Sequence, residues 1–355
     1  MKIALVYDRV NKWGGAERVL LAFHEMFPGA PLYTSVCNFP QANWAEVFPE
    51  VIPSFLQKMP LAKTRHDLYP WLMPMAFESF NFDQYDVVVS VTSEFAKGII
   101  TKPGTFHICY CLTPTRYLWS GYKGYLGTFF RRTVSAPLVS YLRDWDLVSA
   151  QRPDVIVAIS NTVAERIKRY YGRESEVIYP PVDIKIPEVR QVSDTSQGYF
   201  LIVSRLVPYK KVDMVVDVFN KLNWPLIIVG TGSEENKLKK RARSNVRFVG
   251  QVGDVELAKY YSQCEALIFP QEEDFGLVVV EVQKAGRPVI AYRRGGAVET
   301  IEEGRTGMFF EEQIEESLMG VLRKFDEDDF DVDDCKKNAR KFSKENFFRE
   351  FAKLI

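Results

Sequence analysis

The sequence is poor in cysteine and histidine and has no long apolar run. Its 355 residues include five cysteines and three histidines. The cysteines are scattered without a Cys-x-x-Cys spacing, which argues against a disulfide framework or a zinc knuckle and favours a reducing cytoplasmic compartment. The run Ile3–Tyr7 is too short for the apolar region of a signal peptide. Elsewhere no uncharged apolar stretch approaches the roughly 18–20 residues of a spanning helix, so we expect no membrane-spanning segment.

An excess of charge of either sign is also absent. Lysine and arginine total 46, as do aspartate and glutamate, which gives a formal net charge of zero. Nucleic acids are bound mainly through basic surfaces, so this balance predicts no nucleic-acid partner. With 46% hydrophobic residues, the chain has enough apolar side chains for two domains of about 150 residues each.

Short β-branched runs that alternate with helical patterns predict parallel sheets. In the first half, the expected strands are Lys2–Tyr7, Asp86–Val91, Phe106–Cys111 and Asp154–Ile159, and the expected helices are Ala16–Met26 and Val163–Tyr171. Pro180, Pro181 and the polar residues 184–198 predict a linker. In the second half, the expected strands are Tyr199–Ser204, Pro225–Val229, Val246–Val249, Ala266–Phe269 and Pro288–Tyr292.

These patterns predict an α/β protein with two doubly wound, Rossmann-like domains, over residues 1–182 and 183–341. The last segment, Phe342–Ile355, alternates phenylalanine with charged residues and is expected to form an amphipathic helix that packs back on the first domain.

Two basic residues follow the first strand of the second domain. Ligands of open α/β sheets bind beyond the carboxyl ends of the strands. Arg205 leaves that strand and Lys210 lies five residues on. A planar guanidinium and a mobile ammonium suit a diphosphate, and together they neutralise the charge of a leaving group. The alternative interpretation is an exposed basic turn.

A second group of candidates follows the strand Ala266–Phe269. The backbone N–H groups of Phe275, Gly276 and Leu277 are expected at a helix start, where they bind phosphate or hydroxyl oxygens. Glu273 and Glu281 add carboxylates, which accept hydrogen bonds from sugar hydroxyls. A ligand that carries both phosphate and polyol explains the combination. Alternatively, Glu273 is a surface residue and Glu281 only favours the helix.

Gly14 and Gly15 allow a ligand to approach the backbone at the start of the first helix. They do not form the Gly-x-Gly-x-x-Gly fingerprint of dinucleotide-binding proteins, which disfavours a nicotinamide-dependent dehydrogenase.

Together these residues resemble the retaining glycosyltransferases of family 4, which have the GT-B fold of two Rossmann-like domains facing each other across a cleft. The resemblance spans nearly the whole chain and rests on five segments, SRLVPYKKVD (204–213), EEDFGLVVVE (272–281), GRPVIAYRRGGAVET (286–300), GGAERVL (14–20) and VIYPPVD (177–183). LYTSV (32–36) and the segment Ile108–Trp119 are similar to mannosyltransferase-like members of polysaccharide and O-antigen assembly.

The resemblance implies retaining transfer of a hexose, with mannose favoured, from a nucleoside-diphosphate sugar to a saccharide or lipid-linked acceptor hydroxyl. It makes Arg205, Lys210 and Glu273 catalytic, with Arg205 and Lys210 on the donor diphosphate and Glu273 on the transferred sugar. Glu281 would hold the ribose, and the backbone at Gly15 would complete the phosphate site with residues 275–277.

The resemblance also places Val252 and Asp254 beside the nucleotide base. An aspartate there suits a guanine edge, so a GDP-linked donor is favoured over a UDP-linked one.

One position departs from the family pattern. Many relatives have histidine before the Thr-Pro of the first-domain motif, where this chain has Leu112. Leu112 cannot polarise an acceptor hydroxyl, but in the front-face mechanism proposed for the family the leaving diphosphate takes the proton. Arg116 and Tyr117 are the remaining candidates to orient the acceptor.

We expect no metal requirement, because no Asp-x-Asp follows a strand as in metal-dependent GT-A enzymes, and Asp144–Asp146 falls in a helix-like stretch. Residues 128–143 hold Arg131, Arg132 and Arg143 among apolar side chains. They either contact the inner face of a membrane as a peripheral surface or pack on the core of the first domain.

Two alternative functions remain open from the sequence. The first alternative is a nucleotide-sugar-binding subunit that has lost catalysis. The second is another GT-B enzyme such as a sugar-nucleotide epimerase, which would need acid and base groups near the donor.

Overall fold

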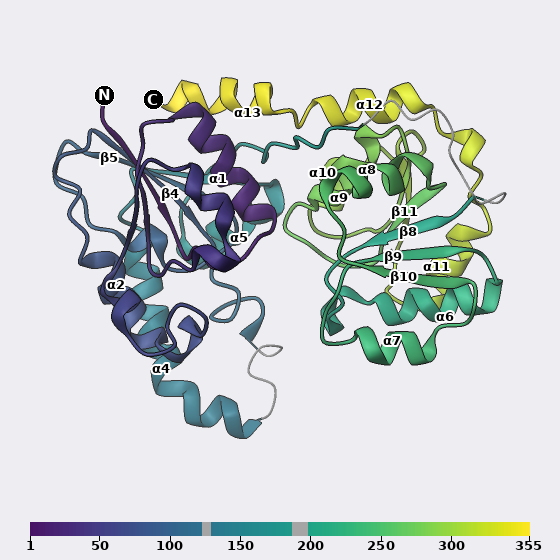
Figure 1. Ribbon diagram of the computed structural model, residues 1–355, viewed down its shortest axis with the longest axis horizontal. Coiled ribbons are helices and arrows are strands. Elements are labelled where there is room, and N and C mark those ends of the chain that lie inside the picture. Colours follow the sequence, from purple (N-terminus) through teal and green to yellow (C-terminus); the bar gives the residue numbers. More distant parts are fainter. Residues whose placement is uncertain (123–128, 187–197) are drawn as a thin grey trace. The chain divides into compact units, whose positions relative to one another are not determined.

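The computed structural model describes residues 1–122, 129–186 and 198–355, with the backbone alone over 129–134. The chain divides into two compact units (Figure 1). Unit 1 comprises Met1–Tyr179 and Glu350–Ile355, and unit 2 comprises Pro180–Arg349. The expected domain boundary after Val182 therefore falls near the beginning of unit 2. Most of the expected linker, residues 187–197, lies outside the described residues.

Unit 1 is built on a parallel seven-stranded sheet in the order β3-β2-β1-β4-β5-β6-β7. The strands are β1 (Ile3–Tyr7), β2 (Leu32–Thr34), β3 (Val51–Pro53), β4 (Val87–Thr92), β5 (Phe106–Cys111), β6 (Val155–Ala158) and β7 (Glu176–Val177). β4 pairs with β1 from Ile3 opposite Val87 to Tyr7 opposite Val91. The expected strands correspond to β1, β4, β5 and β6. The others have only two or three residues, too few to produce a hydrophobic period.

The helices of unit 1 are α1 (Gly15–Met26), α2 (Met73–Glu78), α4 (Phe129–Ser149) and α5 (Asn161–Tyr171). Local interactions stabilise both termini of α5. At the start of α5 the Ser160 hydroxyl accepts a hydrogen bond from Val163 N at 3.1 Å. At its end Gly172 adopts a left-handed conformation (φ 65°), which glycine tolerates without strain.

Unit 2 is built on a parallel six-stranded sheet in the order β10-β9-β8-β11-β12-β13. Its strands are β8 (Phe200–Val203), β9 (Leu226–Val229), β10 (Val246–Gly250), β11 (Ala266–Phe269), β12 (Val289–Tyr292) and β13 (Gly307–Phe310). Its helices are α6 (Val212–Leu222), α7 (Glu235–Arg241), α8 (Asp254–Gln263), α9 (Leu277–Lys284), α10 (Ala297–Thr300), α11 (Glu315–Leu322), α12 (Val332–Arg340) and α13 (Lys344–Phe351), whose last residues belong to unit 1.

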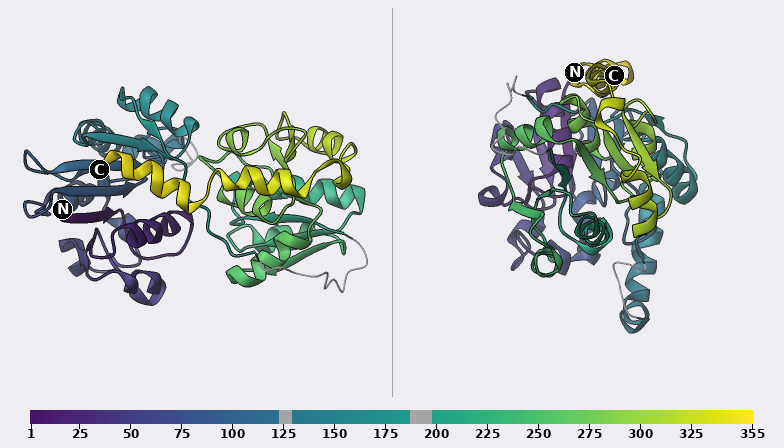
Figure 2. Two further views of the ribbon diagram at one scale, coloured as in Figure 1. Left: turned by 90° about the horizontal axis from the view of Figure 1, so that it is seen from above. Right: turned by 90° about the vertical axis from the view of Figure 1, so that its right-hand side faces the viewer.

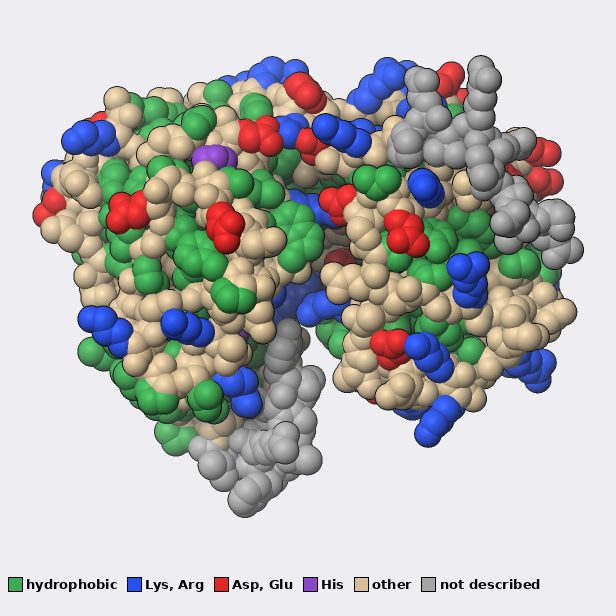
Figure 3. Space-filling model, in the orientation of Figure 1, with side chains coloured by type: hydrophobic (Ala, Val, Ile, Leu, Met, Phe, Trp, Pro, Cys, Tyr) green, Lys and Arg blue, Asp and Glu red, His purple; other side chains and the backbone are tan. Residues whose placement is uncertain are grey.

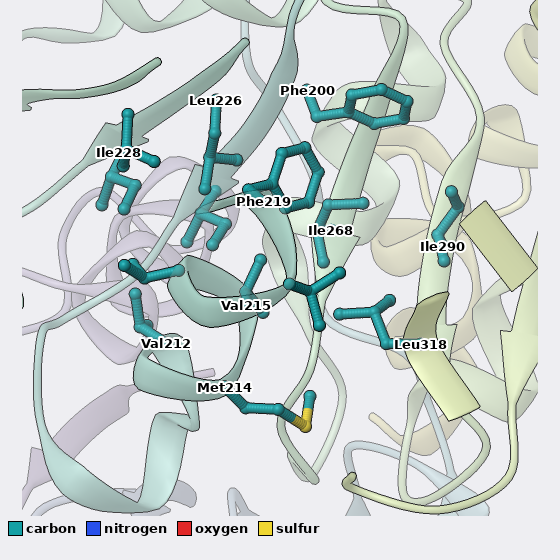
Figure 4. Packing of buried hydrophobic residues seen from close by; sticks show 14 of the residues in the cluster. Phe200, Val212, Met214, Val215, Phe219, Leu226, Ile228, Ile268, Ile290 and Leu318 are labelled. Carbon is teal, nitrogen blue, oxygen red and sulfur yellow. The ribbon is translucent and has the colours of Figure 1, made fainter. Parts of the chain in front are cut away.

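Successive side chains along a strand point to opposite faces of the sheet, so the strands of unit 2 contribute to two hydrophobic cores, one on each face. Ile202, Ile228 and Ile268 pack with α6 and α11 on one face, as Figure 4 shows for part of this cluster. Leu201 and Leu267 pack with α8, α9 and α10 on the other. Each fully buried side chain of this size stabilises the fold by roughly 1.5–3 kcal/mol. Helices therefore cover both faces of the sheet (Figures 1 and 2).

The strand order reverses once in each sheet. In unit 1 the chain runs outward from β1 to β3 and then returns to β4, so β1 and β4 are neighbours. In unit 2 the same reversal makes β8 and β11 neighbours. Such a reversal opens a crevice at the carboxyl ends of the two strands, where ligands of doubly wound proteins bind. The predicted α/β fold with two Rossmann-like units is confirmed.

The carboxy-terminal segment packs through phenylalanine side chains. Phe342 lies with its ring 5.5 Å from that of Phe275 in unit 2. Phe351, fully buried, packs its ring 4.7 Å from Phe23 of α1 within unit 1. The expected helix over residues 342–355 is α13 followed by a short 3-10 turn, Ala352–Leu354.

Within the described ranges, no helix is long and apolar enough to cross a membrane. The side chains of Arg131 and Arg132 lie outside the described residues. Arg143 is engaged within unit 1, since its Nε donates to Leu118 O at 2.7 Å and its guanidinium lies 4.7 Å from the centre of the Tyr122 ring.

Burial of His107 in β5 makes the stability of unit 1 sensitive to acid. Its Nε2 lies 2.8 Å from Ser90 Oγ, and its Nδ1 has no hydrogen-bond partner among the residues described. Burial, aided by Arg152 and Arg173, lowers the pKa of His107 from 6.5 to about 3. Between pH 6.5 and 3, His107 is therefore protonated in the unfolded chain but neutral in the folded chain. The free energy of unfolding falls as the pH falls through this window.

We expect the free energy of unfolding to drop by about 2 kcal/mol between pH 7 and pH 5 through His107 alone. His66, whose pKa is lowered to about 4 by burial and by Arg9, acts in the same direction. Urea unfolding at a series of pH values measures the slope. The variant His107→Gln should reduce it, and an unchanged slope in that variant would contradict the assignment.

Candidate functional site

The loop after β8 carries the two basic candidates of unit 2. Arg205 is exposed, and its Nη2 donates a hydrogen bond to the Tyr209 hydroxyl at 2.7 Å. Lys210 is buried, with 7% of its surface exposed, and its ammonium lies 5.2 Å from the centre of the Tyr209 ring. Tyr209 thus contacts both cations. Gly230 permits this loop to pack closely, because a Cβ there would overlap the carbonyl oxygen of Ser204.

The loop after β11 brings Glu273 to Lys210. The Lys210 ammonium and the Glu273 carboxylate form an ion pair that joins the loops of β8 and β11 at the reversal of strand order. Gln271 Nε2 lies 3.4 Å from the same carboxylate oxygen. Lys210 is therefore held by a carboxylate at the carboxyl edge of the sheet, the edge at which ligands of doubly wound folds bind.

The turn of Gly295 and Gly296 supports this acidic loop. Gly296 N donates to the carbonyl oxygen of Glu273 at 2.8 Å. A Cβ at Gly296 would overlap the Cα of Phe275, so only glycine permits this approach.

The helix α9 begins at the predicted place. Gly276 is its N-cap in a left-handed conformation (φ 87°), and Leu277 is its first residue. Phe275 is buried, and its ring contacts Phe342. The amide groups at this terminus carry the partial positive charge of the helix, which favours an anionic group.

Glu281 lies one turn further along α9 and is 3% exposed. Its Oε2 accepts a hydrogen bond from the Tyr261 hydroxyl of α8 at 2.7 Å. Tyr261 therefore fixes the orientation of this carboxylate. Sequence reasoning had no signal for Tyr261, because it lies within an ordinary helical pattern.

Val252 and Asp254 lie between β10 and α8. Val252 packs against the core, and Asp254 is the exposed first residue of α8. A carboxylate in the first turn of a helix is stabilised by the helix dipole, which by itself accounts for an aspartate at this position.

The unit 1 candidates belong to two loops. Gly15 is the first residue of α1. Leu112 follows β5 and is half-buried, with its N–H donating to Thr92 O at 2.8 Å. Arg116 and Tyr117 follow in the same loop and are also half-buried. Burial, followed by the carboxylates of Glu94 and Asp146, raises the pKa of Tyr117 well above its usual value.

A buried carboxylate that the sequence did not identify holds the loop of Arg116 and Tyr117. Asp146 of α4 is fully buried and pairs with the Lys97 ammonium at 2.5 Å. It accepts further hydrogen bonds from Thr115 Oγ1 (2.9 Å), Trp119 Nε1 (2.7 Å) and the Tyr171 hydroxyl (2.9 Å). Thr115 and Trp119 flank Arg116 and Tyr117, so Asp146 sets the conformation of their loop.

On the face that Figure 3 presents, basic and acidic side chains are interspersed on both units, in keeping with the balanced composition. Among the residues described, no group of three or more His, Cys, Asp or Glu side chains is arranged to hold a metal ion.

Comparison with protein families and solved structures identifies relatives of this chain. Residues 185–342 match the family model described as Glycosyl transferases group 1. An uncharacterized glycosyltransferase of Methanocaldococcus jannaschii is 28% identical over 163 residues, 44% of this chain and 45% of that protein. A probable sucrose-phosphate synthase of Thermosipho melanesiensis is 25% identical over 56% of this chain and 53% of its own length. The chain thus spans about half the length of these curated relatives.

The name of a third relative includes a sugar donor. It is a GDP-mannose-dependent alpha-(1-6)-phosphatidylinositol monomannoside mannosyltransferase of Mycobacterium tuberculosis, 27% identical over 44% of this chain and 48% of its own length.

Solved structures match over the whole chain. Anabaena HepE in complex with UDP has a TM-score of 0.73 at 18% identity, covering 100% of this chain and 99% of that one. The same protein in complex with UDP-glucose also has a TM-score of 0.73, at 17% identity and the same coverage. At these identities the likeness establishes the fold alone. Residues 185–342 therefore match a glycosyl transferases group 1 domain, and the two parallel-sheet units have the fold of GT-B structures.

Proposed function

We propose that the protein is a retaining glycosyltransferase that moves a hexose, with mannose favoured, from a nucleoside-diphosphate sugar to an acceptor hydroxyl. The observation that carries this proposal is the ion pair of Lys210 with Glu273, which joins the loops of β8 and β11 at the strand-order reversal of unit 2. Arg205 lies on the same loop as Lys210, and the start of α9 follows Glu273.

Each of these groups suits one part of a nucleotide sugar. The Arg205 guanidinium and the Lys210 ammonium neutralise a diphosphate, and Lys210 has three N–H donors, enough to bind a phosphate oxygen while it still contacts Glu273. The Glu273 carboxylate accepts hydrogen bonds from sugar hydroxyls. Unit 2 is thus the donor-binding unit, and unit 1, with Arg116 and Tyr117, takes the saccharide or lipid-linked acceptor.

The reaction requires no protein nucleophile. The bond between the anomeric carbon and the diphosphate oxygen breaks while Arg205 and Lys210 stabilise the charge that develops on the diphosphate. The acceptor oxygen bonds to the anomeric carbon on the same face, and its proton passes to the leaving diphosphate. This route needs neither a histidine at Leu112 nor a metal ion.

A panel of nucleotide sugars tests the proposal. GDP-, UDP-, ADP- and dTDP-linked sugars are added in turn, and the melting temperature of the full-length protein is measured. A ligand at about 100 times its Kd stabilises the folded state by roughly 2.7 kcal/mol, so a donor should raise the melting temperature. We expect the largest rise with GDP-mannose, in line with the mycobacterial relative, and UDP-glucose is the alternative that HepE suggests.

The variant Arg205→Ala should remove this rise, because it deletes a diphosphate contact. No rise with any donor would overturn the proposed function.

A further inference from the structure

A second ion pair lies at the carboxyl edge of the sheet in unit 1. Arg9 follows β1 and Glu94 follows β4, the two strands between which the strand order reverses. Arg9 Nη1 lies 2.7 Å from Glu94 Oε1, and the two side chains are 14% and 19% exposed. A charged pair therefore joins the two loops at the edge of the sheet where doubly wound folds bind their ligands.

The backbone around Glu94 is held rigidly. Glu94 N donates to Thr92 Oγ1 at 3.0 Å, and its carbonyl oxygen accepts hydrogen bonds from Lys97 Nζ and, at 3.3 Å, from Thr115 Oγ1. The buried Asp8 carboxylate binds the rest of the loop, accepting from the backbone N–H groups of residues 93, 95 and 96 at 2.7–2.9 Å. The carboxylate of Glu94 thus projects from a fixed loop, as a preorganised binding group requires.

Unit 2 repeats this arrangement at its own reversal, where the Lys210–Glu273 pair joins the loops of β8 and β11. Each unit therefore places one cation after its first central strand and one carboxylate after the neighbouring strand. In unit 2 this geometry accompanies the proposed donor site, which suggests that the pair in unit 1 also faces a ligand.

The chemistry of the Arg9–Glu94 pair fits a neutral polyol. The guanidinium offers N–H donors and the carboxylate offers acceptor lone pairs, so vicinal hydroxyls can both donate and accept there. In unit 2 a second cation, Arg205, accompanies Lys210 for the proposed diphosphate, whereas the Arg9–Glu94 pair has no net charge of its own, so a neutral polyol suits it better than a phosphate. The loop that carries Tyr117 contacts the loop of Glu94, since Thr115 Oγ1 donates to the Glu94 carbonyl oxygen at 3.3 Å. The predicted acceptor residue and the ion pair therefore share one edge of the sheet.

We propose that Arg9 and Glu94 form a hydroxyl-binding site at the strand-order reversal of unit 1, and that this site binds the acceptor saccharide. This inference rests on the proposed function, since the comparison with the donor site and the acceptor role of Tyr117 both come from it.

The test measures binding of simple saccharides to the full-length protein. The probes are the methyl glycosides of mannose, glucose and galactose, titrated by ligand-observed NMR against the wild type and three variants. Glu94→Gln keeps the size of the side chain and removes its charge. Arg9→Gln removes the cation and keeps Glu94. Glu78→Gln is the matched control, because Glu78 pairs with Arg152 at 2.6 Å in the same unit, with 28% and 25% exposure.

We expect at least one glycoside to bind the wild type, and both Glu94→Gln and Arg9→Gln to weaken its Kd about tenfold or more, since a hydrogen bond to a charged group is lost. Glu78→Gln should bind like the wild type. The melting temperature of each variant confirms that it is folded, and the rise with a nucleotide sugar should persist.

Equal binding by the wild type and Glu94→Gln would overturn the proposal, and so would the absence of binding by any of the three glycosides. Both results concern unit 1 alone. The nucleotide-sugar panel tests unit 2, so failure of the acceptor site and failure of the proposed function are distinguishable.

Discussion

Replacement of Lys210 by alanine is expected to slow the release of nucleoside diphosphate from the donor about a hundredfold or more. Lys210 is 7% exposed and fixed by Glu273, so in the proposed reaction its charge is already in place when the diphosphate begins to leave. Removing one such preorganised charge typically costs about 3 kcal/mol of transition-state stabilisation, and each 1.36 kcal/mol corresponds to about tenfold in rate. A coupled assay for the released nucleoside diphosphate, with the donor that the thermal panel selects, gives kcat and KM.

The matched control is Lys240→Ala, which removes an exposed lysine of α7 in the same unit and should leave the rate unchanged. Because Lys210→Ala also leaves Glu273 without its cation, Lys210→Gln, which retains a hydrogen-bond donor, is measured beside it. A folded Lys210→Ala protein with wild-type kcat/KM would exclude Lys210 from the reaction.

The fold could be predicted because its long elements have strong periodic patterns. The sequence pattern predicts β4 and β5, with six residues each, and the amphipathic α5. β13 (Gly307–Phe310) carries no comparable signal, since it follows a turn and pairs with β12 at the edge of the sheet. Edge strands of this kind depend on tertiary pairing, which the local sequence does not encode.

The candidate donor residues follow from their position after strands, but their interactions do not. Lys210 and Glu273 are far apart in the sequence, and only the adjacency of β8 and β11 brings their side chains into contact. The same positional rule, applied to the first half, would have selected Arg9 and Glu94. Neither belongs to a glycine-rich turn or a known motif, so no local feature singled them out.

Asp146 illustrates a different limit of sequence reasoning. As the second acid of Asp144–Asp146 it attracts attention as a metal ligand, and its helical position removes that interpretation. Its contacts come from three separate parts of unit 1, which are Lys97 between β4 and β5, Thr115 and Trp119 after β5, and Tyr171 of α5. A carboxylate shared among separate elements cannot be recognised without the packed structure.

The second large effect is expected for Asp146→Ala, which should lower the free energy of unfolding of unit 1 by about 3–5 kcal/mol. Lys97 is 2% exposed, and although burial alone would lower the pKa of its ammonium, the Asp146 carboxylate outweighs burial and raises that pKa. Without Asp146 the ammonium remains buried and uncompensated, and Thr115, Trp119 and Tyr171 lose a shared acceptor. Urea unfolding monitored by tryptophan fluorescence measures the loss.

Two further variants separate the charge from the packing. Asp144→Ala removes an exposed acid two residues away on α4 and should change the stability little. The double variant Lys97→Met with Asp146→Leu removes both charges and fills the space with apolar atoms, so it should be more stable than Asp146→Ala alone. If the double variant is no more stable, the cost lies in the hydrogen bonds of the Thr115–Trp119 loop rather than in the charge of Lys97. If Asp146→Ala itself unfolds like the wild type, the buried pair does not stabilise unit 1.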